Sequence, residues 1–166
     1  MMLTIETINQ MTQTEFIAQF GCIFEDTPTI AEQAWTARPF QNLNDLHQKM
    51  VEVVAKSMTA KEQLSLICAH PELGKRGKMA AASVQEQTSA GLSQLNTEDY
   101  SRIQALNAAY REKFGFPFVV AVKGLSVTDV VAAMEKRMQT DKSKEMARSL
   151  TEIYKIARFR LADIVQ

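Results

Sequence analysis

Apolar residues recur along this chain at intervals of three and four positions, the spacing that places side chains on one face of an α-helix. The pattern is clearest near residues 44–58, 97–114, 126–134 and 146–164. It predicts an all-α fold, a bundle of roughly eight to nine helices. The apolar positions that carry the pattern include Leu46, Met50, Val53, Val54, Leu64, Ile67, Cys68, Tyr100, Ile103, Leu106, Tyr110, Phe114, Val127, Val130, Val131, Met134, Met146, Leu150, Ile153, Ile156 and Leu161.

Residues that commonly begin helices punctuate the same pattern. The four-residue runs that start at Thr12, Thr29 and Thr59 each end in glutamate and match the capping box. Thr27 before Pro28 is an alternative start for the second of these helices, because proline is favoured at the first helical position.

Similar signals mark the ends of the helices in the second half of the chain. We expect a long helix to open at Thr97, with Glu98 and Asp99 in its first turn, and to end at Gly115. Ser126 is expected to open the next helix. The signals and the apolar spacing agree, so both indicate the same helices.

One segment departs from helical spacing. Residues 116–122 (FPFVVAV) form a short apolar run rich in β-branched residues, which taken alone is typical of a buried strand. The rest of the chain offers no partner strand, and a lone strand cannot satisfy its backbone groups. We therefore predict an irregular, extended, buried segment. Its backbone N–H and C=O groups need other partners, and a polar ligand could supply them.

Length and charge limit the classes of function. With 166 residues, the chain is expected to form a single domain over residues 1–166. Lys and Arg total 19 and Asp and Glu total 19, so the formal net charge is zero. We therefore do not expect nucleic acid as the main partner, because that affinity depends on neutralising phosphates.

The chain shows no sign of a membrane or secretory destination. No apolar run is long enough to cross a bilayer. The first residues lack the basic-then-apolar pattern of a secretion signal, and the last residues lack a peroxisomal address. We therefore expect no membrane association and a cytoplasmic location.

Metal chemistry has few candidate ligands here. Cys22 and Cys68 form no metal-binding spacing, and we expect both to be small buried side chains in a reducing compartment. The two histidines, His47 and His70, form no HExxH or ExxH pair. No metal is therefore expected, and His47 is expected on an exposed helix face.

His70 is the first candidate for chemistry. It follows the apolar run 64–69 and precedes Pro71. Since the residue before a proline is disfavoured in the α region, His70 is expected at a helix end with its side chain held in place. The negative end of the helix dipole favours the charged imidazolium, which suits a proton donor near neutral pH. From these residues alone, His70 is either an acid/base group or a histidine that caps or packs against the helix end.

A second candidate region begins at Ser83. Residues 83–86 (SVQE) match a capping box, in which Ser83 and Glu86 cap each other's backbone amides. Alternatively, the free N–H groups at this helix start bind an anionic ligand. A cap and an anion compete for the same donors, so the two interpretations cannot both hold in full.

Basic residues supply the remaining candidates. Arg158 and Arg160 lie two positions apart, so on a helix they point to different faces. We expect one to be solvated, while the other could point inward and clamp a carboxylate through paired hydrogen bonds. The basic cluster at residues 75–78 (KRGK) is expected to be a solvated loop.

Three blocks of this sequence resemble the OHCU decarboxylases, the 2-oxo-4-hydroxy-4-carboxy-5-ureidoimidazoline decarboxylases of urate breakdown. The blocks are residues 69–74 (AHPELG), 83–92 (SVQEQTSAGL) and 106–118 (LNAAYREKFGFPF). Residues 155–161 (KIARFRL) are similar to the family's last helix. A lone His-Pro pair carries no information, but the blocks in this order and spacing, across nearly the whole chain, are highly specific.

The resemblance implies an all-helical decarboxylase without a cofactor, usually a homodimer, that converts a small anionic ureidoimidazoline to (S)-allantoin and CO2. It implies that His70 is the catalytic acid/base, with Glu86 as its functional partner. Arg160, rather than Arg158, is implied to hold the anionic substrate. The residues implied to contact the substrate are Pro71, Ser83, Val84, Gln85, Glu86, Gln87, Phe118, Val119, Val120, Ala121, Val122 and Arg160.

The implied chemistry explains the absence of a cofactor, because the substrate's own C=N group can accept the electron pair left by CO2. Such an enzyme needs a carboxylate clamp, a group that moves protons and a rigid site. Two alternatives remain open. One is a non-enzymatic helical interaction module, which would show an exposed apolar groove. The other is a hydrolase of a related ureide, which would need an activated water.

Overall fold

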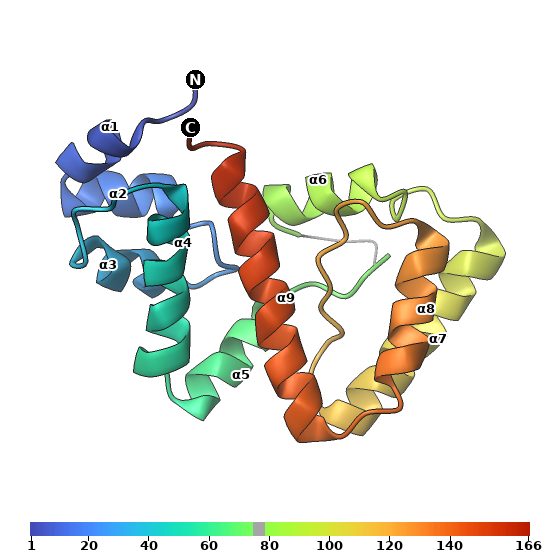
Figure 1. Cartoon of the computed structure of the whole chain (residues 1–166). Helices are drawn as coiled ribbons and strands as arrows, with labels where there is room; N and C mark the ends of the chain where they lie inside the picture. Colours follow the sequence, from blue (N-terminus) through green and yellow to red (C-terminus); the bar gives the residue numbers. More distant parts are fainter. Residues whose placement is uncertain (75–78) are drawn as a thin grey trace. The chain divides into compact units, whose positions relative to one another are not determined.

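The computed structural model describes residues 1–74 and 79–166, and the regular elements of these residues are helical (Figure 1). The predicted all-α fold is therefore confirmed. The predicted solvated loop at residues 75–78 lies outside the described residues. The helices are α1 (Ile5–Gln10), α2 (Gln13–Phe20), α3 (Thr29–Trp35), α4 (Leu43–Glu52), the π-helix η1 (Val53–Ser57), α5 (Ala60–Ala69), α6 (Ala81–Ser89), α7 (Thr97–Phe114), α8 (Val127–Arg137) and α9 (Lys142–Ala162).

The helices belong to two compact units. The terminal unit comprises Met1–Leu66 and Tyr154–Gln166, and the central unit comprises Ile67–Ile153. In the part of the chain that the structure describes, no helix has the length and apolar character needed to cross a bilayer.

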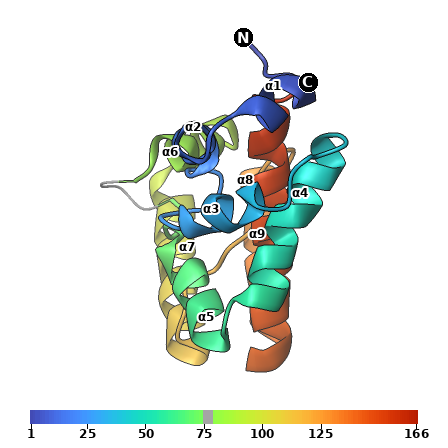
Figure 2. The same cartoon turned by 90° about the vertical axis from the view of Figure 1, so that its left-hand side faces the viewer.

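The terminal unit packs α2, α3 and α4 in sequence, and α3 also contacts η1. Phe16 anchors this core, with its ring centroid 4.7 Å from that of Phe20 and 5.8 Å from that of Phe40. The two ends of the chain lie close together in both views (Figures 1 and 2), where Leu3 pairs with Val165 in an isolated parallel bridge.

The helix starts of the terminal unit confirm two of the three predicted capping boxes. Thr12 and Thr59 each accept from the backbone of the glutamate three residues on, and that glutamate bonds back to the threonine. The box predicted at Thr29 is wrong. Pro28 already has helical dihedrals (φ −65°, ψ −17°), so Thr29 lies inside the helix, and the Thr27 hydroxyl donates to Glu25 O instead of capping.

The central unit is built on α7, which packs against α8. Gly115 ends α7 with φ 80°, a left-handed conformation that favours glycine, and Ser126 opens α8 through a capping box with Asp129. Both boundaries match their predictions. The side chains that fill this core include Ile103, Tyr110, Phe114, Phe116, Phe118, Val130, Met134 and Ile153.

Residues 116–122 lie between α7 and α8 as an extended trace (Figure 1), and they form no strand pairing with the other described residues. All seven residues are buried. The prediction of an irregular buried segment is confirmed.

Three side chains are placed differently from expectation. Cys22 and Cys68 are exposed rather than buried. Cys22 follows the end of α2, and on α5 it is Leu66 with Ile67 that turns inward, which leaves Cys68 facing outward. His47 is half-buried rather than exposed, and its Nε2–H donates to the carbonyl oxygen of Tyr154 at 2.8 Å.

Candidate active site

His70 directly follows the last residue of α5. Its backbone N–H donates to Ile67 O at 3.2 Å, so the chain is still held to the helix at this point. The residue is only 6% exposed. The structure therefore confirms a histidine held at a helix end, and the following Pro71 restricts the backbone that leaves the helix.

The loop after His70 is attached to α6. The backbone N–H of Gly74 donates to Gln87 Oε1 at 3.0 Å, and this contact is buried. Gly74 has φ +67°, a region that side chains with a Cβ rarely adopt. A Cβ there would also lie 3.0 Å from Leu95 Cδ1. Glycine at this position lets the loop turn close to its neighbours.

The start of α6 overturns the predicted capping box of Ser83 and Glu86. The helix begins at Ala81, and its N-cap, Ala80, has no side-chain hydrogen bond. Ser83 therefore lies within the first turn rather than before it. The physical reason is that Ala80 is already extended (φ −61°, ψ 145°) and takes the cap position itself.

The candidate residues 83–87 lie on two different faces of α6. Ser83 and Gln87, four positions apart, are buried, and Glu86 beside them is half-buried. Val84 and Gln85 are exposed on the opposite side. The side chains that can face a buried ligand are therefore those at positions 83, 86 and 87.

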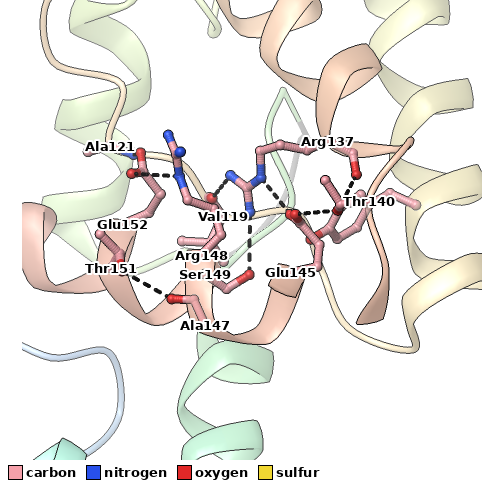
Figure 3. Close-up of polar contacts among 11 residues, drawn as sticks. Val119, Ala121, Arg137, Thr140, Glu145, Ala147, Arg148, Ser149, Thr151 and Glu152 are labelled. Carbon is pink, nitrogen blue, oxygen red and sulfur yellow. Dashed lines mark hydrogen bonds and ion pairs between the residues drawn. The ribbon is translucent and has the colours of Figure 1, made fainter. Parts of the chain in front are cut away.

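The extended segment takes its hydrogen bonds from buried charged side chains (Figure 3). Arg137 Nη1 donates to Val119 O at 2.6 Å, and Ala121 N donates to Glu152 Oε1 at 3.2 Å. From the sequence, a polar ligand was one partner that could satisfy these groups, and neither Arg137 nor Glu152 was among the candidates. The spacing of Arg137 was an available signal, because it follows Met134 by three positions on the buried face of α8.

Arg137 belongs to a larger buried network (Figure 3). Its Nε donates to Glu145 Oε1 at 2.5 Å. Tyr110 OH donates to the same oxygen at 2.6 Å. The guanidinium also lies over the ring of Phe118, 4.2 Å from its centroid. Burial, followed by the hydrogen bond to Glu145, raises the pKa of Tyr110, so its hydroxyl stays protonated and serves as a donor.

The two candidate arginines near the chain end lie in the terminal unit. Arg160 is buried, where Nη2 lies 2.7 Å from Glu25 Oε1 and Nη1 donates to Ile23 O at 3.2 Å. Arg158 donates to Asn44 Oδ1 at 2.9 Å in an exposed contact. Arg160 is thus the inward-pointing member of the pair, and its charge already faces a buried carboxylate.

These contacts join the His70 loop to α6, and residues 119–121 to α8 and α9. The protein is all-helical in its described regular elements, and its central unit holds a buried histidine as the acid/base candidate. Hydrogen-bonding side chains of the same unit suit a polar ligand.

Residues 9–162 match the protein family described as OHCU decarboxylase. The chain is 40% identical over 162 residues to the 2-oxo-4-hydroxy-4-carboxy-5-ureidoimidazoline decarboxylase of Halalkalicoccus jeotgali, a match that covers 98% of this chain and 92% of that protein. It is 43% identical over 164 residues to the uric acid degradation bifunctional protein PucL of Bacillus subtilis, covering 99% of this chain and 33% of PucL. The chain thus spans about a third of the length of PucL.

A solved structure supports the same assignment. The crystal structure of (S)-allantoin synthase superposes with a TM-score of 0.79 at 25% identity, over 98% of this chain and 54% of that one. This chain therefore belongs to the OHCU decarboxylase family, as its residue blocks predicted, and the family is one of decarboxylating enzymes.

Proposed function

We propose that this chain converts 2-oxo-4-hydroxy-4-carboxy-5-ureidoimidazoline to (S)-allantoin and CO2 in urate degradation, with His70 as the acid/base group. Family membership over residues 9–162 supports the reaction. The observation that carries the role of His70 is its burial at the end of α5, on a loop that Gln87 holds at Gly74. A buried histidine on an anchored backbone suits proton transfer in a preorganised site.

The reaction needs a group that transfers protons, and the substrate itself can accept the electron pair that CO2 leaves. When the bond to the carboxylate breaks, CO2 leaves and the electron pair passes to the ring C=N group of the substrate. The resulting enol-like species must then take a proton on one face to give the (S) product. His70 moves this proton or that of the substrate hydroxyl, and half-buried Glu86 orients His70 or the ring nitrogens.

Gln87 retains a donor for the substrate. Its Oε1 accepts from Gly74 N, whereas its Nε2 lies 3.6 Å from Met79 Sδ. A thioether is a weak acceptor, so a ureido or ring carbonyl oxygen is a stronger partner for this NH2 group. Gln87 therefore links the loop of His70 to the substrate.

The other proposed contacts follow the family resemblance. Pro71, Ser83 and residues 118–122 line the substrate, with the exposed Val84 and Gln85 at the margin of the same block. Arg160 holds the substrate carboxylate, supported by its burial and by the anchoring of its guanidinium on Glu25 and Ile23 O.

The role of Arg160 is tested with a matched pair. Arg160→Lys keeps the charge next to Glu25 but loses bidentate geometry, and it is expected to raise KM. Arg158→Lys is the control and should leave KM unchanged. If the two substitutions changed KM equally, Arg160 would not be the residue that binds the substrate carboxylate.

The reaction itself is tested by generating the unstable ureidoimidazoline in situ from urate, with the two enzymes that act before this step in urate degradation. This protein is then added. The proposal expects faster loss of the intermediate's absorbance, together with circular dichroism from (S)-allantoin. A decay rate equal to the spontaneous one, with racemic product, would overturn it.

The surface offers no support for the alternative of an interaction module. Among the described residues, the exposed large apolar side chains are Met1, Met2 and Val84, two of them at the chain end. An interaction module was expected to expose a contiguous apolar groove.

The resemblance also carries proposals about assembly and location. We propose a homodimer in the cytoplasm, and a single cooperative domain over residues 1–166. Light scattering on the purified chain tests the dimer, and cell fractionation tests the location. Coincident urea transitions, followed by probes placed in the terminal and in the central unit, test the single domain.

A further inference from the structure

In the loop after His70, both the C=O and the N–H of one peptide group are hydrogen-bonded to side chains. The C=O of Leu73 accepts from Asn107 Nδ2 at 2.9 Å, and the N–H of Gly74 donates to Gln87 Oε1 at 3.0 Å. These two groups belong to the same peptide bond. Side-chain amides from α7 and α6 therefore hold a single peptide group, the one that joins the third and fourth residues after His70.

The side of α7 that faces this loop carries further contacts to it. Arg111, one turn after Asn107, forms an ion pair with Glu72 at 2.7 Å. Gln104, one turn before Asn107, has its Nε2 3.8 Å from where a Cβ of Gly74 would stand. Positions 104, 107 and 111 follow helical spacing, so one stripe of α7 contacts residues 72–74.

Asn107 has a buried side-chain oxygen that destabilises the fold. It is 2% exposed, and its Oδ1 has no hydrogen-bond partner among the described residues. A buried acceptor without a partner is destabilising. An apolar residue at this place would avoid that cost, but it would leave the Leu73 carbonyl without this donor. The donor of Asn107 therefore has a use that packing does not explain, and the group it serves is the Leu73 carbonyl.

We propose that Asn107 is a positioning residue for catalysis, which sets the orientation of His70 by holding the Leu73–Gly74 peptide. The backbone of His70 is fixed at one end to Ile67 O, and the loop is fixed at the other end by Asn107 and Gln87. Pro71 further restricts one of the dihedrals between the two anchors. This proposal rests on the proposed role of His70.

The test uses Asn107→Ala and the isosteric Asn107→Asp in the full chain. Because Asn107 does not itself act on the substrate, both variants should lower kcat by about 10²-fold, the loss that a misplaced catalytic group produces, with KM within about twofold of wild type. An ionised carboxylate cannot donate to Leu73 O, but a protonated one can. The kcat of Asn107→Asp relative to wild type should therefore recover as the pH is lowered.

A second readout is independent of turnover. The chain has two histidines, so the ring-nitrogen NMR signals of uniformly labelled protein comprise two sets, and His47→Gln assigns them. In both Asn107 variants, the His70 signals and their titration midpoint should change while those of His47 stay in place. The isosteric Asp variant keeps this comparison available if the Ala variant does not fold.

The control is Asn96→Ala, which removes the N-cap of the same helix, where Asn96 Oδ1 accepts from Asp99 N at 2.7 Å. It should lower the Tm but leave kcat and the His70 signals unchanged. The proposal is overturned if both Asn107 variants keep wild-type kcat and His70 signals, or if Asn96→Ala reproduces their effects. Failure of the proposed function is distinguishable, since wild type would then be inactive while the NMR comparison still decides the positioning role.

Discussion

Arg137 Nη1 donates to the carbonyl oxygen of Val119 at 2.6 Å. Through this contact a charged residue of α8 fixes the backbone of a buried segment that pairs with no strand among residues 1–74 and 79–166. The same guanidinium is neutralised by Glu145, whose carboxylate also receives hydrogen bonds from Tyr110 and Thr140. The extended segment therefore depends on a polar network rather than on a sheet. This dependence makes the segment sensitive to single substitutions far from any substrate.

Replacing Arg137 by methionine is expected to lower the free energy of unfolding by about 3–5 kcal/mol, the usual result of removing one partner of a buried ion pair. Glu145 would remain buried without its cation, and Val119 O would lose its donor. Urea unfolding followed by circular dichroism measures the change.

The matched control is Arg102→Met. Arg102 pairs with Glu135, but the two side chains are 56% and 48% exposed. Exposed pairs contribute about 0–1 kcal/mol, so this substitution should be nearly neutral. If Arg137→Met proved as mild as the control, the network would not support the segment.

Glu152 offers a graded test of the second backbone anchor. Glu152→Gln keeps an oxygen that can accept from Ala121 N and should stay within about 1 kcal/mol of wild type. Glu152→Ala leaves a buried N–H unpaired and should cost about 1–3 kcal/mol. Equal losses for the two variants, measured by urea unfolding, would show that the charge of Glu152 matters and its hydrogen bond does not.

The proposed acid/base role of His70 gives a prediction on rate. His70→Ala should reduce kcat by about 10²–10⁴-fold, the range typical of one positioned acid/base group, with the far-ultraviolet circular dichroism unchanged. His47→Gln, which changes the other histidine of the chain, should retain turnover. Near-full stereospecific turnover by His70→Ala would contradict the assignment.

Much of this fold follows from local signals in the sequence. Helix periodicity and capping residues placed α7 between Thr97 and Gly115, and they placed the start of α8 at Ser126. These features depend on a few neighbouring residues, which is why they are visible without tertiary structure. The extended segment was also predictable, because its composition excluded a helix and the chain offered no second strand.

What the sequence did not reveal depends on distant contacts. The backbone partners of the segment, Arg137 and Glu152, lie 18 and 31 positions away from the residues they bind. Charged residues on a helix are usually solvated, so the helical spacing of Arg137 after Met134 was too weak a signal to predict its burial. The clamp on the Leu73–Gly74 peptide is equally non-local, since Asn107 lies 34 positions from Leu73.

The start of α6 shows how a local pattern can mislead. Residues 83–86 carry capping-box letters, yet the cap position is taken by Ala80, which has no side-chain oxygen. Installing one by Ala80→Ser should stabilise the protein by about 1 kcal/mol, because Ala80 already has the extended backbone that an N-cap needs.

Chemical denaturation of Ala80→Ser measures this gain, with Ala81→Ser as the control inside the helix. Serine at position 81 should give no gain, since it cannot cap from the first helical position. A loss of stability in Ala80→Ser would show that the observed helix start is wrong.

The last prediction concerns how stability depends on pH through His47. Burial, with a further contribution from the charge of Arg158, lowers the pKa of His47 below its usual 6.5, and the hydrogen bond to Tyr154 O only partly opposes this. Between the lowered folded-state pKa and about 6.5, the unfolded chain binds more protons than the folded chain. The free energy of unfolding therefore falls as pH is lowered through this window, and the contribution of His47 is fully present above it.

Replacing His47 by glutamine removes the titrating group while keeping an NH2 donor for Tyr154 O. Wild type should lose stability between pH 7.5 and 5 more steeply than His47→Gln, because only wild type takes up this proton on unfolding. Urea unfolding at half-unit pH intervals gives both slopes. The exposed carboxylates with lowered pKa values, Glu15, Glu62, Asp129 and Asp141, act at lower pH, below about 4.5, and are common to both proteins. Parallel slopes above pH 5 would mean that His47 gains its proton equally well in the folded state, contrary to its burial.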